Sequence, residues 1–324
     1  MSHQSVTIVP EGKLVYGLQL PVQALSLRTS MEWERDTGSV EDLVATARAC
    51  DAAGFFYVAV CDHVAIPRSH AEMMGTTWFD TVATLSYLAA ATTRTHLMSN
   101  VYVAAYRHPF QTAKAFATLD ALSGGRAILG VGAGHVEAEF DALGVSFADR
   151  GRITNDAIDA VVAAWSDEFP EINTPTWQAR DLGQRPRPVR QPRPPIWIGG
   201  MGKPALRRVA ERGDGWIPQG TPRSQMPADI ETILSHRDRV RPGASVDIGF
   251  ITEYIYVGDA DWELPRGTIS GPAGRVADSL NQMGEIGVSH LQLRFAARSR
   301  SELCDQIAAF GADIGPNLVR NALD

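Results

Sequence analysis

An aspartate followed directly by a histidine, Asp62-His63, offers the clearest acid–base chemistry in the sequence. The pair stands just after Phe55–Val60, a continuous apolar run that predicts a buried strand. Histidine gives or takes a proton near neutral pH, and a neighbouring carboxylate can raise its pKa. The long loop predicted over residues 64–77 is also typical of functional segments. We therefore predict Asp62 and His63 as catalytic residues; the alternative is an aspartate that caps the loop and a histidine that packs.

A glycine-rich turn follows a second apolar run, Ile196–Gly200, and leads into a helical pattern that begins at Lys203. Backbone N–H groups at a helix N-terminus bind phosphate, and Lys203 adds a positive charge. We therefore predict cofactor-binding residues at Gly199, Gly200, Met201, Gly202 and Lys203. The alternative is a tight turn that simply needs glycine. The stretch lacks G-x-x-x-x-G-K-[ST], so it is not a nucleotide triphosphate loop.

Another glycine-rich stretch, residues 130–135, ends the apolar run Ala127–Gly132. Because glycine has no side chain, the backbone here can come close to a flat or bulky ligand. We therefore predict cofactor contacts at Gly132, Ala133, Gly134 and His135. The stretch is not a dinucleotide fingerprint, because His135 stands at the third glycine position and no acidic residue follows at the right distance. For His135 and Asn100, ligand contact and an ordinary satisfied polar group remain equal alternatives.

Other catalytic classes lack their sequence signals. No two histidines have helical metal-ligand spacing and the acidic residues do not cluster, so we expect no metal. The absence of G-x-S-x-G argues against a serine hydrolase. The three cysteines, Cys50, Cys61 and Cys304, lie far apart, which favours a reducing compartment without a disulfide framework.

Composition and charge limit the kinds of molecule that this protein is expected to bind. The chain has 324 residues, 44% of them hydrophobic, and a formal net charge of -7. No basic run is long enough to suggest nucleic acid. No apolar stretch reaches the roughly 18 residues of a membrane span, and the N-terminus has no signal-peptide pattern. We therefore expect a cytoplasmic protein with a small-molecule substrate and neither a nucleic-acid nor a membrane partner.

Eight apolar runs alternate with helical patterns, which favours a closed parallel barrel over an open doubly wound sheet. The expected strands are Leu14–Leu20, Phe55–Val60, His96–Val103, Ala127–Val131, Ile196–Gly200, Gly215–Pro218, Val246–Val257 and Val288–Arg294. No composition shift divides the chain, so we predict one α/β domain over residues 1–324, a single (β/α)8 TIM barrel with insertion loops. The carboxyl ends of the strands, where such barrels place their active sites, would then gather the residues above.

Several details of the helices and loops follow from local signals. Ser39 and Asp42 predict a near capping box at the start of a helix that Gly54 ends. Helices are also expected over residues 78–91, 109–122, 150–165, 203–212, 226–239 and 272–286, and from a cap at Ser301 to Phe310. Residues 1–12 are expected to be a loose arm, and the long loops over residues 64–77 and 166–195 are candidate lids.

Motifs along nearly the whole chain resemble the bacterial luciferase-like superfamily, in its branch of oxidoreductases that use the deazaflavin coenzyme F420. They are Ala59-Val-Cys-Asp-His63, Tyr106-Arg-His-Pro-Phe110, Ala117–Arg126, Leu129–Gly134, Glu139–Gly144, Pro188-Val189, Pro194–Gly200 and Ala210–Trp216. The resemblance implies a TIM barrel, often a homodimer, that binds coenzyme F420 or FMN.

The resemblance also assigns roles to individual residues. Asp62 would contact the deazaflavin ring, and His63 would sit near its reacting carbon. A non-proline cis peptide at Asn100–Val101 would support the ring, and the Gly199-Gly200 turn would hold the phosphate. Some members have glutamate where this chain has His135. That difference puts a carboxylate proton donor there in doubt, so His63 or His135 could share the role.

Three functions remain open from the sequence. The first is hydride transfer between coenzyme F420 and an alcohol, carbonyl or unsaturated substrate, with His63 supplying or removing a proton. The second is a two-component monooxygenase that uses reduced FMN and oxygen. A flavin reductase would be the partner of the monooxygenase, and a deazaflavin reductase would be the partner of the hydride-transfer enzyme. The third is a non-catalytic carrier of the cofactor. A charged coenzyme tail would favour a basic groove, for which the sequence offers Arg107, Arg152, Lys203, Arg207 and Arg208.

Overall fold

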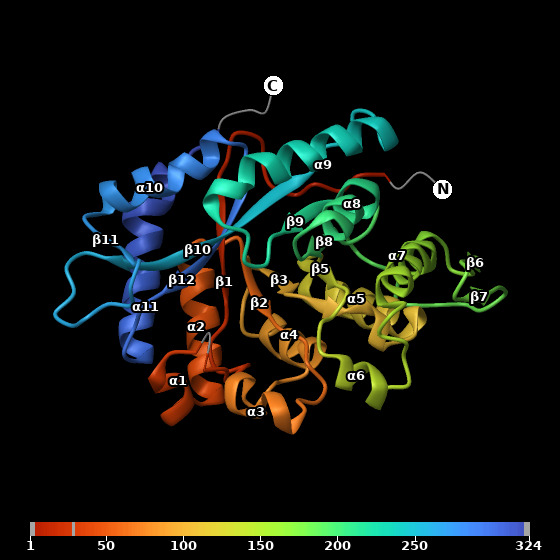
Figure 1. Cartoon of the computed structure of the whole chain (residues 1–324), viewed down its shortest axis with the longest axis horizontal. Coiled ribbons are helices and arrows are strands. Elements are labelled where there is room, and N and C mark those ends of the chain that lie inside the picture. The colour runs from red at the N-terminus through yellow and green to blue at the C-terminus, as the bar shows by residue number, and fades with distance from the viewer. Residues whose placement is uncertain (1–3, 28–29, 321–324) are drawn as a thin grey trace.

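The computed structural model describes residues 4–27 and 30–320, and within them the strands close into a parallel barrel (Figure 1). The eight strands of the barrel, called staves below, are β1 (Val15–Gln19), β2 (Tyr57–Val60), β3 (His96–Ser99), β5 (Ala127–Gly132), β8 (Ile196–Gly199), β9 (Gly215–Ile217), β10 (Asp247–Val257) and β12 (His290–Phe295). Each stave pairs with the next in this order, and β12 pairs with β1 to close the ring. The predicted (β/α)8 TIM barrel is therefore confirmed.

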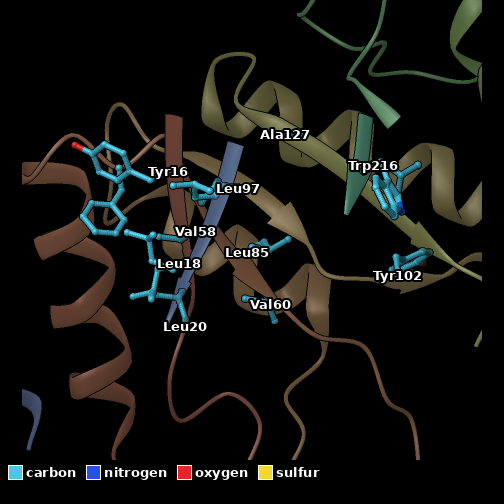
Figure 2. Packing of buried hydrophobic residues seen from close by; sticks show 14 of the residues in the cluster. Tyr16, Leu18, Leu20, Val58, Val60, Leu85, Leu97, Tyr102, Ala127 and Trp216 are labelled. Atoms are coloured by element: carbon cyan, nitrogen blue, oxygen red, sulfur yellow. The ribbon is translucent and has the colours of Figure 1, made fainter. Parts of the chain in front are cut away.

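Both faces of these strands are buried, which explains their continuous apolar sequences. Every residue of β2 and of β5 is buried. Inward-facing side chains fill the barrel interior with a cluster of Tyr57, Ala59, Met98, Ile128, Trp197 and Ile217. Outward-facing side chains, Val58 and Val60 among them, pack with Leu85 and other helix residues in the larger cluster drawn in Figure 2.

Helices surround the barrel in Figure 1. The main ones are α2 (Val40–Ala52), α4 (Thr81–Ala89), α5 (Pro109–Ser123), α7 (Arg150–Ser166), α8 (Lys203–Arg212), α9 (Met226–Val240), α10 (Ala273–Glu285) and α11 (Arg300–Ala309). The predicted cap of α2 is confirmed as a reciprocal capping box: Ser39 Oγ accepts from the Asp42 N–H at 3.3 Å, and the Asp42 carboxylate accepts from the Ser39 N–H at 2.9 Å.

Smaller elements complete the chain. The helices are α1 (Glu32–Asp36), α3 (Arg68–Met74), α6 (Glu137–Ala142), η1 (Ala104–Tyr106), η2 (Arg223–Gln225), η3 (Phe310–Ile314) and η4 (Gly315–Asn317). The strands are β4 (Tyr102–Val103), β6 (Ile172–Asn173), β7 (Gln178–Ala179) and β11 (Ile269–Gly271). In the described part of the chain, no helix is both long and apolar enough to cross a membrane.

Three local predictions are wrong. The helix expected from residue 78 begins at Thr81, because Asp80 caps it by accepting from the Ala83 N–H at 2.8 Å. Ser299, and not Ser301, caps the last helix, since its Oγ accepts from the Glu302 N–H at 3.2 Å. The loop expected over residues 64–77 contains the helix α3.

The N-terminal arm is also not loose where it is described; residues 1–3 of the expected arm lie outside the described residues. The Val6 N–H donates to Asp214 Oδ1 at 2.9 Å, and the Ile8 N–H donates to Asp247 Oδ2 at 3.0 Å. Both aspartates are buried at the amino ends of β9 and β10. The arm therefore closes the end of the barrel opposite the carboxyl ends of the strands.

The segment over residues 166–195 lies along the outside of the barrel. Its Gln184 side chain donates to the Phe110 carbonyl at 2.8 Å, and the Val189 and Arg190 N–H groups both donate to buried Asp120 at 2.8 Å. Phe110 and Asp120 belong to α5. These bonds fasten the segment against α5.

Candidate active site

Asp62 stands at the carboxyl end of β2 and is 5% exposed. Arg107 grips it through two bonds, from Nη1 to Oδ2 at 2.7 Å and from Nη2 to Oδ1 at 2.8 Å. The Val103 N–H of β4 also donates to Oδ2, at 2.8 Å. Such a bidentate, charge-assisted pair fixes geometry. Asp62 therefore holds Arg107 and β4 in place at the barrel mouth, while its predicted contact with a coenzyme ring stays a prediction.

His63 is paired with a carboxylate that the sequence analysis did not assign. Its Nδ1 lies 2.7 Å from Glu139 Oε2, and the Glu139 side chain is fully buried. Glu139 Oε1 accepts from the Val64 and Ala65 N–H groups at 2.6 and 3.1 Å. Tyr106 donates its hydroxyl to Oε2 at 3.2 Å. Glu139 thus anchors both the His63 ring and the chain that follows it.

The charges of this cluster decide which nitrogen of His63 carries hydrogen. Burial acts to raise the pKa of Glu139, but the hydrogen bonds from His63, Ala65 and Val64 outweigh burial and lower it. Burial and the neighbouring Glu139 raise the pKa of Tyr106, which therefore stays a hydroxyl donor. An ionised Glu139 can only accept, so Nδ1 of His63 must donate. Nε2 is left as the ring nitrogen that can exchange a proton.

Two further rings surround His63. The Trp78 ring lies edge-on with its centroid 4.4 Å from that of His63, and the His135 ring lies 5.4 Å away. The structure therefore brings His135, which follows β5, beside the catalytic candidate of β2. Only 10% of the His63 side chain is exposed, so its proton chemistry would take place largely shielded from water.

The expected non-proline cis peptide at Asn100–Val101 is confirmed. It interrupts the third stave between β3 and β4. A Cβ added to Gly132 or Gly199 would collide with the side chain of Val101. These two glycines therefore make room for Val101, which sequence reasoning could not foresee. Gly134 also needs its small size, because a Cβ there would lie 2.8 Å from the Phe140 ring, and it has a positive φ of 77°.

Side-chain amides form a polar cluster at the carboxyl ends of four staves. Asn100 donates to Gln292 Oε1 at 2.7 Å and to Gln19 Oε1 at 3.2 Å, and Gln219 donates to Asn100 Oδ1 at 3.2 Å. Gln19 ends β1, Gln292 lies in β12 and Gln219 follows β9. Asn100 was predicted, but the three glutamines were missed because they belong to strands far apart in the sequence.

The predicted phosphate turn also lies at this end of the barrel. Gly200 and Gly202 have positive φ values of 111° and 78°, and Gly202 is the N-cap of α8. Outside residues 201–203, no atom lies within 4 Å of a Cβ added to Gly202. Met201 and Lys203 are exposed, and no carboxylate pairs with Lys203 within the described ranges. The turn therefore presents open backbone beside an unpaired cation.

The expected basic groove is only partly formed. Arg107 is committed to Asp62, and Arg208 is buried against the Asn155 side chain and the Gly151 carbonyl. Arg152 and Arg207 are exposed but lie near carboxylates of their own helices. Among residues 4–27 and 30–320, no group of three or more acidic, histidine or cysteine side chains is placed to hold a metal ion.

The fold and the site define an enzyme of the TIM-barrel class, with a shielded histidine–glutamate pair at the barrel mouth. Residues 22–290 match the family model of the luciferase-like monooxygenases, and the chain belongs to this family. Relatives with a named activity include F420-dependent dehydrogenases and a monooxygenase, and this chain is likewise an oxidoreductase.

Individual relatives are similar in sequence over part of the chain, and one solved structure shares its fold. An uncharacterized Mycobacterium tuberculosis protein is 29% identical over 213 residues, which cover 62% of this chain and 72% of that protein. The F420-dependent glucose-6-phosphate dehydrogenase of Beutenbergia cavernae is 33% identical over 198 residues, 59% of this chain and 56% of that enzyme. The monooxygenase RslO1 from Streptomyces bottropensis shares the fold, with a TM-score of 0.77, 18% identity and coverage of 94% and 99% of the two chains.

Proposed function

We propose that this enzyme is a coenzyme F420-dependent oxidoreductase that moves a hydride to or from an alcohol or carbonyl carbon of a small organic molecule. The observation that carries the proposal is the bond of 2.7 Å between His63 Nδ1 and Glu139, which leaves Nε2 for proton exchange at the barrel mouth. The similarity to an F420-dependent dehydrogenase from Beutenbergia cavernae supports the choice of coenzyme.

The residues at the mouth fit a deazaflavin. The pyrimidine edge of such a ring alternates carbonyl oxygens with an N–H, and side-chain amides match that pattern because each both donates and accepts. Gln219 is exposed, and within the described structure its Oε1 accepts no hydrogen bond, so it can still bind a ligand. The open turn at Gly202 and the cation of Lys203 fit a phosphate at the start of α8.

When bound, the coenzyme would supply the hydride chemistry, and the protein supplies orientation, proton transfer and a dry site. His63 Nε2 would take the hydroxyl proton as an alcohol is oxidised, or return it in the reverse direction. Glu139 holds Nδ1–H in place and stabilises the positive charge that then develops on the imidazole. Trp78 and His135 pack against the ring and keep it in that orientation.

An FMN-dependent monooxygenase is the second candidate. The family is described as luciferase-like monooxygenase, and FMN has the same pyrimidine edge, so the amide cluster would also match that edge of FMN. A non-catalytic carrier is the third possibility, but a carrier has no need of the His63–Glu139 pair.

Turnover assays with the purified enzyme test the proposal. We expect oxidised coenzyme F420 to be reduced in the presence of at least one member of a panel of primary and secondary alcohols. The variant His63→Asn should lose about 100-fold or more in kcat, whereas Arg48→Gln on the exposed face of α2 should match the wild type. Turnover only with reduced FMN and oxygen would support the monooxygenase instead. Coenzyme binding without turnover of either kind would support the carrier.

A further inference from the structure

Three alternate residues of β12 face the inside of the barrel. His290 stacks on Trp197 in the barrel interior, with ring centroids 4.1 Å apart. Gln292 lies one step nearer the mouth and accepts from Asn100. Side chains two residues apart on a strand share a face, so Arg294 is the next inward residue, at the mouth itself. It is only partly buried.

An irregularity in the neighbouring strand brings an aromatic side chain to Arg294. In the register of β10 with β12, Gly249 pairs with His290, Ile251 with Gln292, and then Tyr254 with Arg294. The last step advances three residues on β10 but only two on β12, which is the signature of a β-bulge. Bulges at barrel rims re-aim side chains, and this one turns Tyr254 to the inward face beside Arg294.

Tyr254 fixes the guanidinium of Arg294 without neutralising it. Arg294 Nη2 donates to the Tyr254 hydroxyl at 3.0 Å, and the guanidinium carbon lies 4.3 Å from the ring centroid. Within the described ranges no carboxylate pairs with Arg294. The nearest acidic residue along β10, Glu253, is itself gripped by Arg223 at 2.8 and 3.0 Å.

Arg294 is thus a fixed cation whose remaining N–H groups have no acidic partner in the described structure. A guanidinium with free N–H groups is suited to bind a carboxylate through two parallel hydrogen bonds. Stave β1 alone separates β12 from β2, which leads to His63, whereas β9 and β10 both separate β12 from the phosphate turn after β8. The cation therefore lies on the His63 side of the mouth.

We infer that Arg294 and Tyr254 form a binding site for a carboxylate group of the substrate. The inference rests on the proposed function, in which His63 acts on an alcohol or carbonyl carbon of the same molecule. The substrate class is accordingly a hydroxy acid or oxo acid, with the carboxylate held by β12 and the reacting carbon near β2.

Calorimetric binding without coenzyme tests the site apart from the reaction. The probes are pyruvate, levulinate and 4-oxocyclohexanecarboxylate, each compared with its methyl ester. At least one acid should bind the wild type about tenfold or more tightly than its ester, because a charge-assisted pair with arginine is worth about that factor. Arg294→Gln should remove the preference, Arg294→Lys should keep part of it, and Arg48→Gln, an exposed change of equal charge on α2, should leave it intact.

Equal binding of acids and esters to the wild type, or no binding of any acid, would overturn the inference. So would a preference for acids that survives in Arg294→Gln. A titration with coenzyme F420 separates the substrate from the coenzyme's anionic tail: if Arg294→Gln weakens coenzyme binding, the site belongs to the tail and the substrate assignment is wrong. If the acids bind as expected but the enzyme neither binds coenzyme F420 nor turns over with it, the proposed function fails while the carboxylate site stands.

Discussion

Replacing Glu139 by glutamine should prevent His63 Nε2 from accepting a proton while leaving the size of the side chain at position 139 nearly unchanged. The wild-type carboxylate accepts from four donors: the His63 ring, the Val64 and Ala65 N–H groups and the Tyr106 hydroxyl. Glutamine keeps one acceptor oxygen, which the two backbone N–H groups occupy. Its NH2 group then faces His63, and because it cannot accept, the imidazole must move its hydrogen from Nδ1 to Nε2. The nitrogen needed for proton acceptance would become a donor.

The expected loss in kcat for Glu139→Gln is about 100-fold or more, the usual contribution of a positioned acid–base group. Stability should fall by about 2–4 kcal/mol, since the His63 and Tyr106 donors lose charge-assisted bonds in a buried place. The lowered pKa of Glu139 gives the stability loss a pH dependence. Its contribution is present above the ordinary glutamate pKa of about 4.3 and is lost as pH falls through the lower folded value. The difference in unfolding free energy between variant and wild type should therefore shrink as pH falls below about 4.3.

The rate of turnover as a function of pH, measured with urea unfolding on the same samples, checks both parts. Tyr106→Phe is the matched control, because it removes one bond to Glu139 and leaves the His63 tautomer unchanged. It should stay within a few fold of the wild-type rate. A Glu139→Gln enzyme with nearly the wild-type rate and an unchanged pH profile would refute the role given to this pair.

Two further predictions concern the barrel that supports the site. Gly132→Ala should destabilise the protein by about 1–3 kcal/mol in urea unfolding, because the added Cβ would collide with Val101. The added change Val101→Ala should restore part of this loss, and failure of the rescue would contradict the packing described. The control Gly274→Ala should be harmless, because its Cβ meets nothing within 4 Å. Burial lowers the pKa of His96 to about 4 and of His290 to about 3. Their contribution to stability is complete above the ordinary histidine pKa of about 6.5 and falls below it by about 1.4 kcal/mol per pH unit for each ring. Burial raises the pKa of Asp247 to about 7, and this offsets about one ring's loss over the same range. The unfolding free energy of the wild type should therefore still fall by a net of about 1.4 kcal/mol per pH unit between about pH 6 and pH 4, and a flat value would argue against these neutral, buried histidines.

The barrel was predictable because its strands are buried on both faces and so leave long apolar runs between helical patterns. The residues at which helices begin and end were harder to predict. Ser299 and Ser301 are the same residue type two positions apart, and only the local backbone decides which one caps α11. The N-terminal arm was misjudged for another reason: its backbone donors meet Asp214 and Asp247, which are more than 200 residues away in the chain.

The site shows the same division between local and distant signals. His63 was found because it follows directly on a predicted strand, where the barrel places its chemistry. The sequence marks Glu139 only as part of a family motif, since a glutamate on a short helix ordinarily faces solvent. Its partner His63 lies 76 residues earlier, so only the fold reveals the pair. The bulge that turns Tyr254 toward Arg294 has no sequence signal either.

A tryptophan-fluorescence titration of the purified protein with oxidised coenzyme F420 and, separately, with FMN would show directly which coenzyme the barrel mouth binds. We expect tight binding of coenzyme F420 and weak binding of FMN. Tight FMN binding with weak F420 binding would contradict this expectation and point to oxygen chemistry with a flavin reductase as partner. Binding of neither would mean that the glycine turns and the amide cluster serve the fold alone.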